Sequence, residues 1–115
     1  MINPYEALAN GIIEQAAKDH RNSAKFLRRN PRTEILEEIV AEQIAERNAM
    51  REERKALGLK PEKIKPTREE RKLNKIISCE IMIAETERFF LSVWFTDLTD
   101  VDGAWLLDNI KKTEA

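Results

Sequence analysis

Cysteine is nearly absent from this sequence, and its scarcity excludes several kinds of site. The single cysteine, Cys79, cannot form an intramolecular disulfide, and one thiolate is too few for a cysteine-rich zinc site. A chain without disulfides fits a reducing cytosol. We therefore expect buried apolar side chains, in one modest core, to hold this 115-residue chain together.

Long apolar runs are also missing. No run approaches the roughly 18 apolar residues that a membrane-spanning helix needs. The first six residues, MINPYE, match neither a signal peptide nor a myristoylation signal. The sequence predicts a soluble, cytoplasmic protein that makes no membrane contact.

Glycine and proline occupy only seven positions, whereas charged residues make up 36% and apolar residues 42% of the chain. This composition favours helix and argues against disorder. The net charge of -1 gives no overall field that would attract nucleic acid. Charge is unevenly spread, because residues 46–75 carry eleven cations against six Glu, and residues 76–115 carry three cations against eight acids.

Apolar residues recur at helical spacing, and no strand pattern interrupts them. The sequence predicts four helices, at residues 12–29, 31–57, 67–95 and 103–112. The end of the second helix and the start of the third are charged, so we expect them to lie together as the tip of an antiparallel hairpin. The predicted fold is all-α: a small helical bundle with a long protruding antiparallel helical hairpin. It is one domain, with a compact base from residues 1–45 and 76–115 and a projecting tip at residues 46–75.

Helix boundaries follow from local chemistry. The Asn-Pro pairs at residues 3–4 and 30–31 are helix-start signals. Asn10 and Gly11 predict a break or kink. Gly58 predicts the stop of the second helix, and a capping box that begins at Thr67 predicts the start of the third.

The residues from Glu87 to Leu107 include five of the seven aromatic side chains. As core residues, Phe89, Phe90, Trp94 and Trp105 would supply the large buried areas that a thin helical protein needs. The same side chains could instead anchor a partner or a second copy. We expect mainly core packing, with one or two aromatics exposed, because a single thin helix cannot cover them all.

The sequence DVDG at residues 100–103 resembles the middle of a calcium-binding loop. In that alignment Leu98 occupies the first ligand position and Asn109 the last, where an oxygen ligand and a bidentate Glu are required. Helix capping by Thr99 or Asp100 explains these residues better. His20 and Cys79 are expected to be structural residues on apolar helix faces. No catalytic, metal or cofactor site is therefore predicted.

Basic residues are the main candidates for contact with a partner or nucleic acid. Interleaved Glu residues favour a solvated helical face, whereas a stripe of cations is all that phosphate contacts require. Both alternatives remain open. The candidate contact residues are Arg21, Lys25, Arg28, Arg29, Arg32, Arg47, Arg51, Arg54, Lys60, Lys63, Lys65, Arg68 and Arg71.

The two ends of the chain resemble a family of small proteins without assigned chemistry, encoded by phages and prophages of Gram-positive bacteria. The resemblance is carried by IIEQAAKDHR at residues 12–21, RRNP at 28–31, ERFF at 87–90, WF at 94–95 and LTDVDG at 98–103. It covers about half of the chain.

Three departures from the family pattern matter. His20 stands where Tyr is expected, and Ala104 stands where an acid is usual. Residues 34–77 look like an insertion. The resemblance therefore implies that the charged hairpin elaborates a compact helical base.

These observations predict a non-enzymatic interaction protein of a mobile element, which binds a host protein or protein–nucleic-acid complex in the bacterial cytoplasm. A concrete version is an inhibitor of a host defence nuclease, such as an anti-CRISPR protein. The alternative is a nucleic-acid-binding accessory protein that uses the basic face of the first helix and the hairpin tip. Self-association is also expected if apolar positions on the hairpin are exposed.

Overall fold

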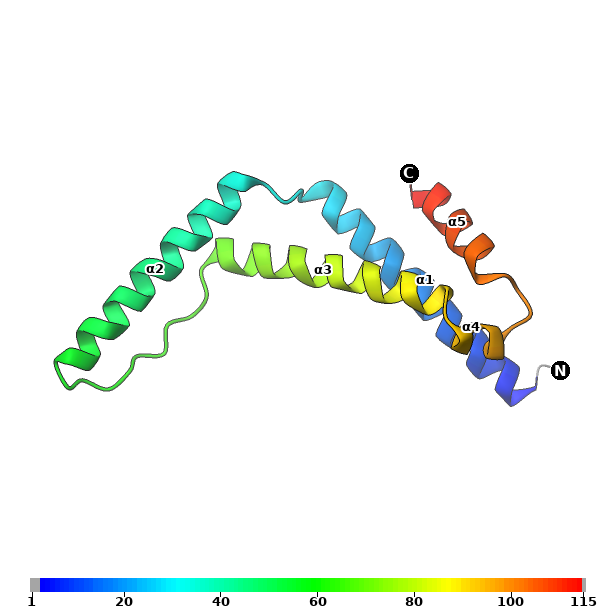
Figure 1. Ribbon diagram of the computed structural model, residues 1–115, viewed down its shortest axis with the longest axis horizontal. Helices are drawn as coiled ribbons and strands as arrows, with labels where there is room; N and C mark the ends of the chain where they lie inside the picture. Colours follow the sequence, from blue (N-terminus) through cyan, green and yellow to red (C-terminus); the bar gives the residue numbers. More distant parts are fainter. Residues whose placement is uncertain (1–2, 115) are drawn as a thin grey trace. The chain divides into compact units, whose positions relative to one another are not determined.

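The computed structural model describes residues 3–114, and in this range its regular structure is entirely α-helical (Figure 1). The predicted all-α fold class is confirmed. The described helices, in chain order, are α1 (Pro4–Arg29), α2 (Glu34–Ala56), α3 (Arg68–Phe90), α4 (Val93–Leu98) and α5 (Gly103–Glu114).

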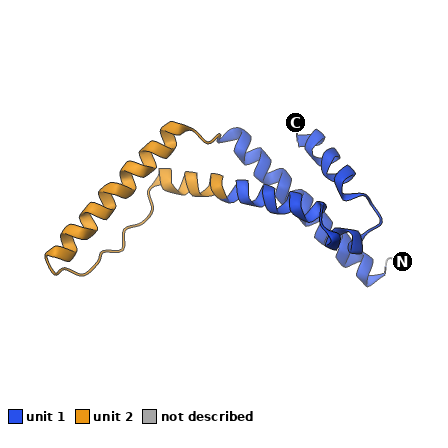
Figure 2. Cartoon of the chain, in the orientation of Figure 1, with its two compact units in different colours: residues 1–30, 78–115 blue, residues 31–77 orange. Residues whose placement is uncertain are grey.

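The chain forms two compact units (Figure 2). Unit 1 consists of residues 1–30 and 78–115, and unit 2 consists of residues 31–77. The second boundary lies close to the expected junction at residue 76. The first lies well before the expected one at residue 45, because all of α2 belongs to unit 2.

The helix α1 runs from Pro4 to Arg29 without a break at Asn10 and Gly11, so it begins eight residues before the predicted start at residue 12. Asn3 caps the helix by accepting a hydrogen bond from the Tyr5 amide at 2.8 Å, and Pro4 is its first residue. An interior glycine costs a helix only about 1 kcal/mol. The burial of Ala9, just before Gly11, shows that this part of α1 packs against the rest of unit 1.

The third helix was expected to run to residue 95, but it ends at Phe90 and a separate short helix, α4, follows. Ser92 accounts for the break. Its hydroxyl donates to the Phe89 carbonyl at 2.6 Å and accepts from the Phe95 amide at 3.2 Å, which caps α4. On one uninterrupted helix Phe90 and Phe95 would point about 140° apart. The turn allows both to be buried together.

The core of unit 1 contains Phe90, Phe95, Leu107 and Ile110. Phe90 and Phe95 are almost fully buried, and their ring centroids lie 5.5 Å apart. Partly buried side chains from α1 and α3 pack against this cluster: Ile13, Ala16, Ala17 and Phe89, together with Leu106 of α5. Apolar burial is therefore concentrated where α4 and α5 pack on α1.

Both tryptophans are exposed, Trp94 at 56% and Trp105 at 61%. Their assignment to the core was therefore wrong, whereas the expectation of one or two exposed aromatics is confirmed. Phe95, which was not expected in the core, is completely buried.

The start of α5 is set by Asp102, which follows both expected capping residues, Thr99 and Asp100. Its carboxylate accepts hydrogen bonds from the amides of Ala104 at 2.9 Å and Trp105 at 3.2 Å. Capping by the Asp-rich turn is confirmed, but neither Thr99 nor Asp100 is the capping residue.

Unit 2 is built on α2 and the first turns of α3. Thr33 caps α2 by accepting from the Leu36 amide at 3.2 Å, so this helix begins three residues after the predicted start at Pro31. The capping role of Thr67 is confirmed, because its hydroxyl accepts from the Glu70 amide at 3.1 Å. Gln43 joins the two helices by donating to a Glu69 carboxylate oxygen at 3.3 Å.

The helix α2 ends at Ala56, and Gly58 follows with a φ of 71°, as the predicted stop requires. Near the middle of α2, Arg47 pairs with Glu70 in the first turn of α3, but nearer its end α2 is not matched by an equally long arm of α3. A loop accompanies it instead, since the Arg54 guanidinium donates to the Lys60 carbonyl at 3.1 Å and 3.3 Å. Proline residues 61 and 66 keep this loop out of helix.

Candidate interaction surfaces

An apolar groove of unit 1 lies between α1 and the C-terminal half of α3, with a volume of about 530 Å³. The α1 wall extends from Ala7 to Asp19. The α3 wall consists of Met82, Glu85, Thr86 and Phe89, and α4 adds Trp94. A groove of this volume is within the range that proteins use to bind ligands or partner side chains.

We call this groove the α1–α3 groove. Its walls are mainly apolar, because the polar groups on them are bonded within their own helix and aromatic rings pack beside them. Thr86 is buried, and its hydroxyl donates to the Met82 carbonyl of its own helix at 2.8 Å. The hydroxyl proton is therefore not available to a ligand in the groove. Trp94 packs edge-on against Phe89, with ring centroids 5.2 Å apart and planes at 70°. Leu8 is 64% exposed at the opposite wall. The groove therefore offers apolar surface to a partner.

Two carboxylates, Asp19 and Glu85, lie on opposite walls of the groove. Asp19 accepts a hydrogen bond from the Gln15 side-chain amide at 2.8 Å, which holds it on the α1 side. Among the described residues that line the groove there is no Lys or Arg. The charge at the groove is therefore negative.

A buried polar cluster joins three helices of unit 1 at His20, which is 3% exposed. Its Nδ1 lies 2.7 Å from a Glu114 carboxylate oxygen, and its Nε2 lies 3.3 Å from a Glu87 carboxylate oxygen. Lys111 also reaches Glu87, at 3.1 Å. Because carboxylates accept hydrogen bonds, a protonated imidazole can donate to both at once.

The pKa of Glu87 lies below its usual value. Burial acts to raise this pKa, but hydrogen bonds from Lys111 and His20, and the charges of these two groups, together lower it more. His20 thus has the structural role expected of it, with two carboxylate partners. Its ring is not accessible to a substrate.

The basic residues predicted on α1 lie on its exposed surface. Arg28 also stabilises unit 1, because its guanidinium donates to the Glu114 backbone carbonyl. Arg21, Lys25 and Arg29 are exposed to solvent. They are therefore accessible to a partner.

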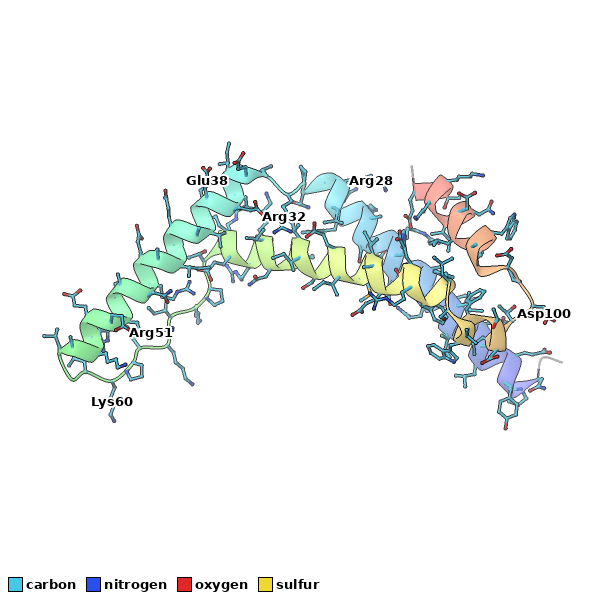
Figure 3. The ribbon with its side chains drawn as sticks, viewed as in Figure 1. Arg28, Arg32, Glu38, Arg51, Lys60 and Asp100 are labelled. Carbon is cyan, nitrogen blue, oxygen red and sulfur yellow. The ribbon has the colours of Figure 1, made fainter. Side chains whose placement is uncertain are left out.

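The basic residues predicted in unit 2 fall into two groups. Arg47 and Arg54 make internal contacts, Arg47 with the buried carboxylate of Glu70 and Arg54 with the loop. Arg32 pairs with Glu37. The remaining candidates are exposed: Arg51, Lys60, Lys63, Lys65, Arg68 and Arg71. Figure 3 shows Arg51 near the end of α2 and Lys60 in the loop that follows.

A second, polar pocket lies beside the Asp-rich turn, where Glu6 and Asn10 of α1 approach residues 96–100. Within residues 3–114, His, Cys, Asp and Glu side chains do not gather into a group of three that could hold a metal ion. Cys79 is half-buried in α3. Over the same range, no helix combines the length and apolar character needed to cross a bilayer.

Comparisons with protein-family models, with curated proteins and with solved structures found no match to this chain. The α1–α3 groove was not predicted from the sequence. Its one local signal is Gly11, which we read as a helix break. In the structure a Cβ atom added at Gly11 would have no atom within 4 Å, so the glycine leaves space on the groove wall.

Proposed function

We propose that this chain is a protein-interaction module that binds its partner through the α1–α3 groove. The observation that carries this proposal is the groove itself, an apolar surface with Trp94 and Leu8 more than half exposed on either side. Exposed apolar surface of this kind is costly in water unless a partner covers it. Partly exposed tryptophans are also frequent anchors in protein interfaces.

A non-enzymatic role is part of the proposal. The buried cluster of His20, Glu87 and Glu114 explains the only histidine as a structural link between helices. The chemistry that remains at the groove is apolar contact and negative charge, which supports binding and not bond cleavage.

We further propose a mobile-element origin and a partner in host macromolecular machinery, on the strength of the phage-family resemblance alone. Inhibition of a host defence nuclease is the specific form of this proposal. Tagged protein would be incubated with lysate of a Gram-positive bacterium, and bound proteins would be quantified by mass spectrometry. We expect one stoichiometric host protein.

The matched variants in this experiment are Gly11→Leu, which fills the groove, and Asn22→Leu, which adds the same side chain to an exposed position of α1 outside it. The host protein should be lost with Gly11→Leu and kept with Asn22→Leu. Recovery of no stoichiometric protein, or equal recovery with both variants, would argue against this function.

Nucleic-acid binding is the second candidate, and the exposed cations of unit 2 favour it. Lys60, Lys63 and Lys65 lie on one loop, and Arg68 and Arg71 follow on the first turn of α3. Such a cluster predicts binding that weakens steeply as salt rises. Absence of DNA or RNA binding at about 50 mM salt would exclude this candidate, since phosphate contacts are strongest at low ionic strength.

A further inference from the structure

We infer that the α1–α3 groove binds an amphipathic helix of a partner protein whose apolar face is flanked by Lys or Arg. This inference rests on the proposed interaction function and specifies the chemistry of the partner. Helices bind in grooves of this kind by placing apolar anchors from successive turns against the walls.

The dimensions of the groove suit a helix. Its α1 wall runs from Ala7 to Asp19, which corresponds to about 18 Å, or three helical turns. A partner helix of about 12 residues has the same length. Small ligands are usually enclosed over most of their surface. Here Leu8 and Trp94 are more than half exposed, so the groove is too open to enclose one.

The backbone of α1 is accessible at the middle of the groove. Gly11 lies on the wall, and a Cβ atom added there would meet no atom within 4 Å beyond its chain neighbours and the adjacent backbone of α1. No contact inside the described part of the chain requires glycine there, although an interior glycine disfavours the helix. A partner side chain can therefore approach the α1 backbone closely at this point.

The negative charge of the groove favours basic residues on both edges of a bound partner helix. Asp19 and Glu85 lie on opposite walls, so cations on both edges of a bound helix would each meet a carboxylate. Trp94 offers in addition an exposed ring, on which a Lys or Arg can stack. An acidic helix would meet like charge on both sides, which lowers its affinity.

The test uses the full chain carrying Trp105→Phe, in which Trp94 is the remaining tryptophan and reports on the groove by its fluorescence. The probes are three libraries of 14-residue helical peptides with the same randomised apolar positions. Their flanking positions are Lys and Arg in the first library, Glu in the second and Gln in the third. Binding is measured by selection from each library and then by titration of single peptides.

We expect the basic library to yield peptides that change Trp94 fluorescence and bind about tenfold more tightly than their Glu-flanked counterparts. Gly11→Leu should abolish this binding. This variant cannot simply fail to fold for lack of helix propensity, because leucine favours a helix more than glycine does. Circular dichroism on the same samples verifies that the helices are intact.

Charge reversal supplies a second, independent readout. Glu85→Lys should weaken the basic peptides about fivefold and strengthen the acidic ones. The matched control is Glu14→Lys, an exposed position of α1 outside the groove, which should leave both affinities unchanged.

Several outcomes would overturn the inference. Equal binding of basic and acidic libraries, or no change with Glu85→Lys, would exclude charge selection while leaving an apolar interaction site in place. Dimers of the chain that Gly11→Leu dissociates would assign the groove to a second copy. If no library binds, yet a host protein is recovered by the chain and lost with Gly11→Leu, the occupant is not a helix although the interaction function stands.

Discussion

The packing of α5 on the end of α3 makes a sharp prediction at Gly103. This residue is buried at the start of α5, against the last residue of α3. A Cβ atom added there would lie 1.8 Å from the Phe90 carbonyl oxygen and 3.0 Å from Cδ1 of Phe95. Among the described residues a positive φ occurs at Gly58 and not at Gly103. Glycine is therefore required at position 103 by the close approach of these atoms, and not by its backbone conformation.

The expected cost of Gly103→Ala is large because the obstacle is backbone. Ordinary contact begins near 3.4 Å, so the start of α5 and the Phe90 carbonyl must separate by about 1.6 Å. Overpacking a core typically costs about 1–3 kcal/mol, and a rigid carbonyl favours the upper end of this range. The higher helix propensity of alanine offsets at most about 1 kcal/mol of this destabilisation. A net loss of about 2 kcal/mol should lower the melting temperature of unit 1 by roughly 8–16 °C.

Gly11→Ala is the matched control, since its Cβ atom would meet nothing within 4 Å. It should stabilise α1 by about 0.5–1 kcal/mol. Both tryptophans belong to unit 1, so thermal and urea unfolding followed by tryptophan fluorescence reports on this unit. If Gly103→Ala unfolds within 0.5 °C of the unmodified chain, or is more stable than Gly11→Ala, the described packing of α5 on Phe90 is incorrect.

Three further changes test other contacts. Because the pKa of Glu87 is lowered on folding, its contribution to stability is present above the usual pKa of 4.5 and is lost as the pH falls below that value. Glu87→Gln removes this contribution. It should therefore flatten the acid side of the curve of unfolding free energy against pH, measured by urea unfolding. Arg47→Met leaves the buried Glu70 carboxylate unpaired and should cost about 3 kcal/mol, whereas adding Glu70→Leu should recover most of this loss in denaturant titrations of helicity. Thr67→Ala removes the cap of α3 and should cost about 1 kcal/mol by the same measurement.

Two helix ends that depend on neighbouring residues, at Gly58 and Thr67, were predictable from the sequence. Thr67 caps α3 through an amide three residues away, and Gly58 adopts the positive φ that a helix stop requires. Both effects are local, so a short window of sequence contains the information. The Asp-rich turn follows the same logic, although its capping residue is Asp102 and not one of the two positions that were proposed.

Features that depend on distant partners were not predictable. His20 binds Glu87 and Glu114, which lie 67 and 94 residues further along the chain. The helix break at Ser92 could not be predicted either, because the apolar pattern of the sequence continues through it. The break is stabilised by the burial of Phe95 together with Phe90. The α1–α3 groove depends on the distance between two helices, which periodicity does not determine.

The division of the chain gives the last prediction. The insertion implied by the phage-family resemblance, residues 34–77, nearly coincides with unit 2, residues 31–77. The apolar cluster of Phe90, Phe95, Leu107 and Ile110 and the polar cluster around His20 both lie in unit 1. Their contacts join α1 to helices at the other end of the sequence, so α2 is not needed to complete them.

Replacing residues 32–77 by a flexible Gly-Ser linker should therefore leave unit 1 folded. A chain of this size buries enough surface to fold alone, although with a modest margin. We expect a cooperative unfolding transition of tryptophan fluorescence and a retained response of Trp94 to a basic peptide that binds the groove. Gly103→Ala in the shortened chain should again lower the midpoint, which distinguishes native packing from collapse. A gradual, non-cooperative transition would instead mean that unit 2 is required for the fold of unit 1, and that the resemblance does not mark an independent base.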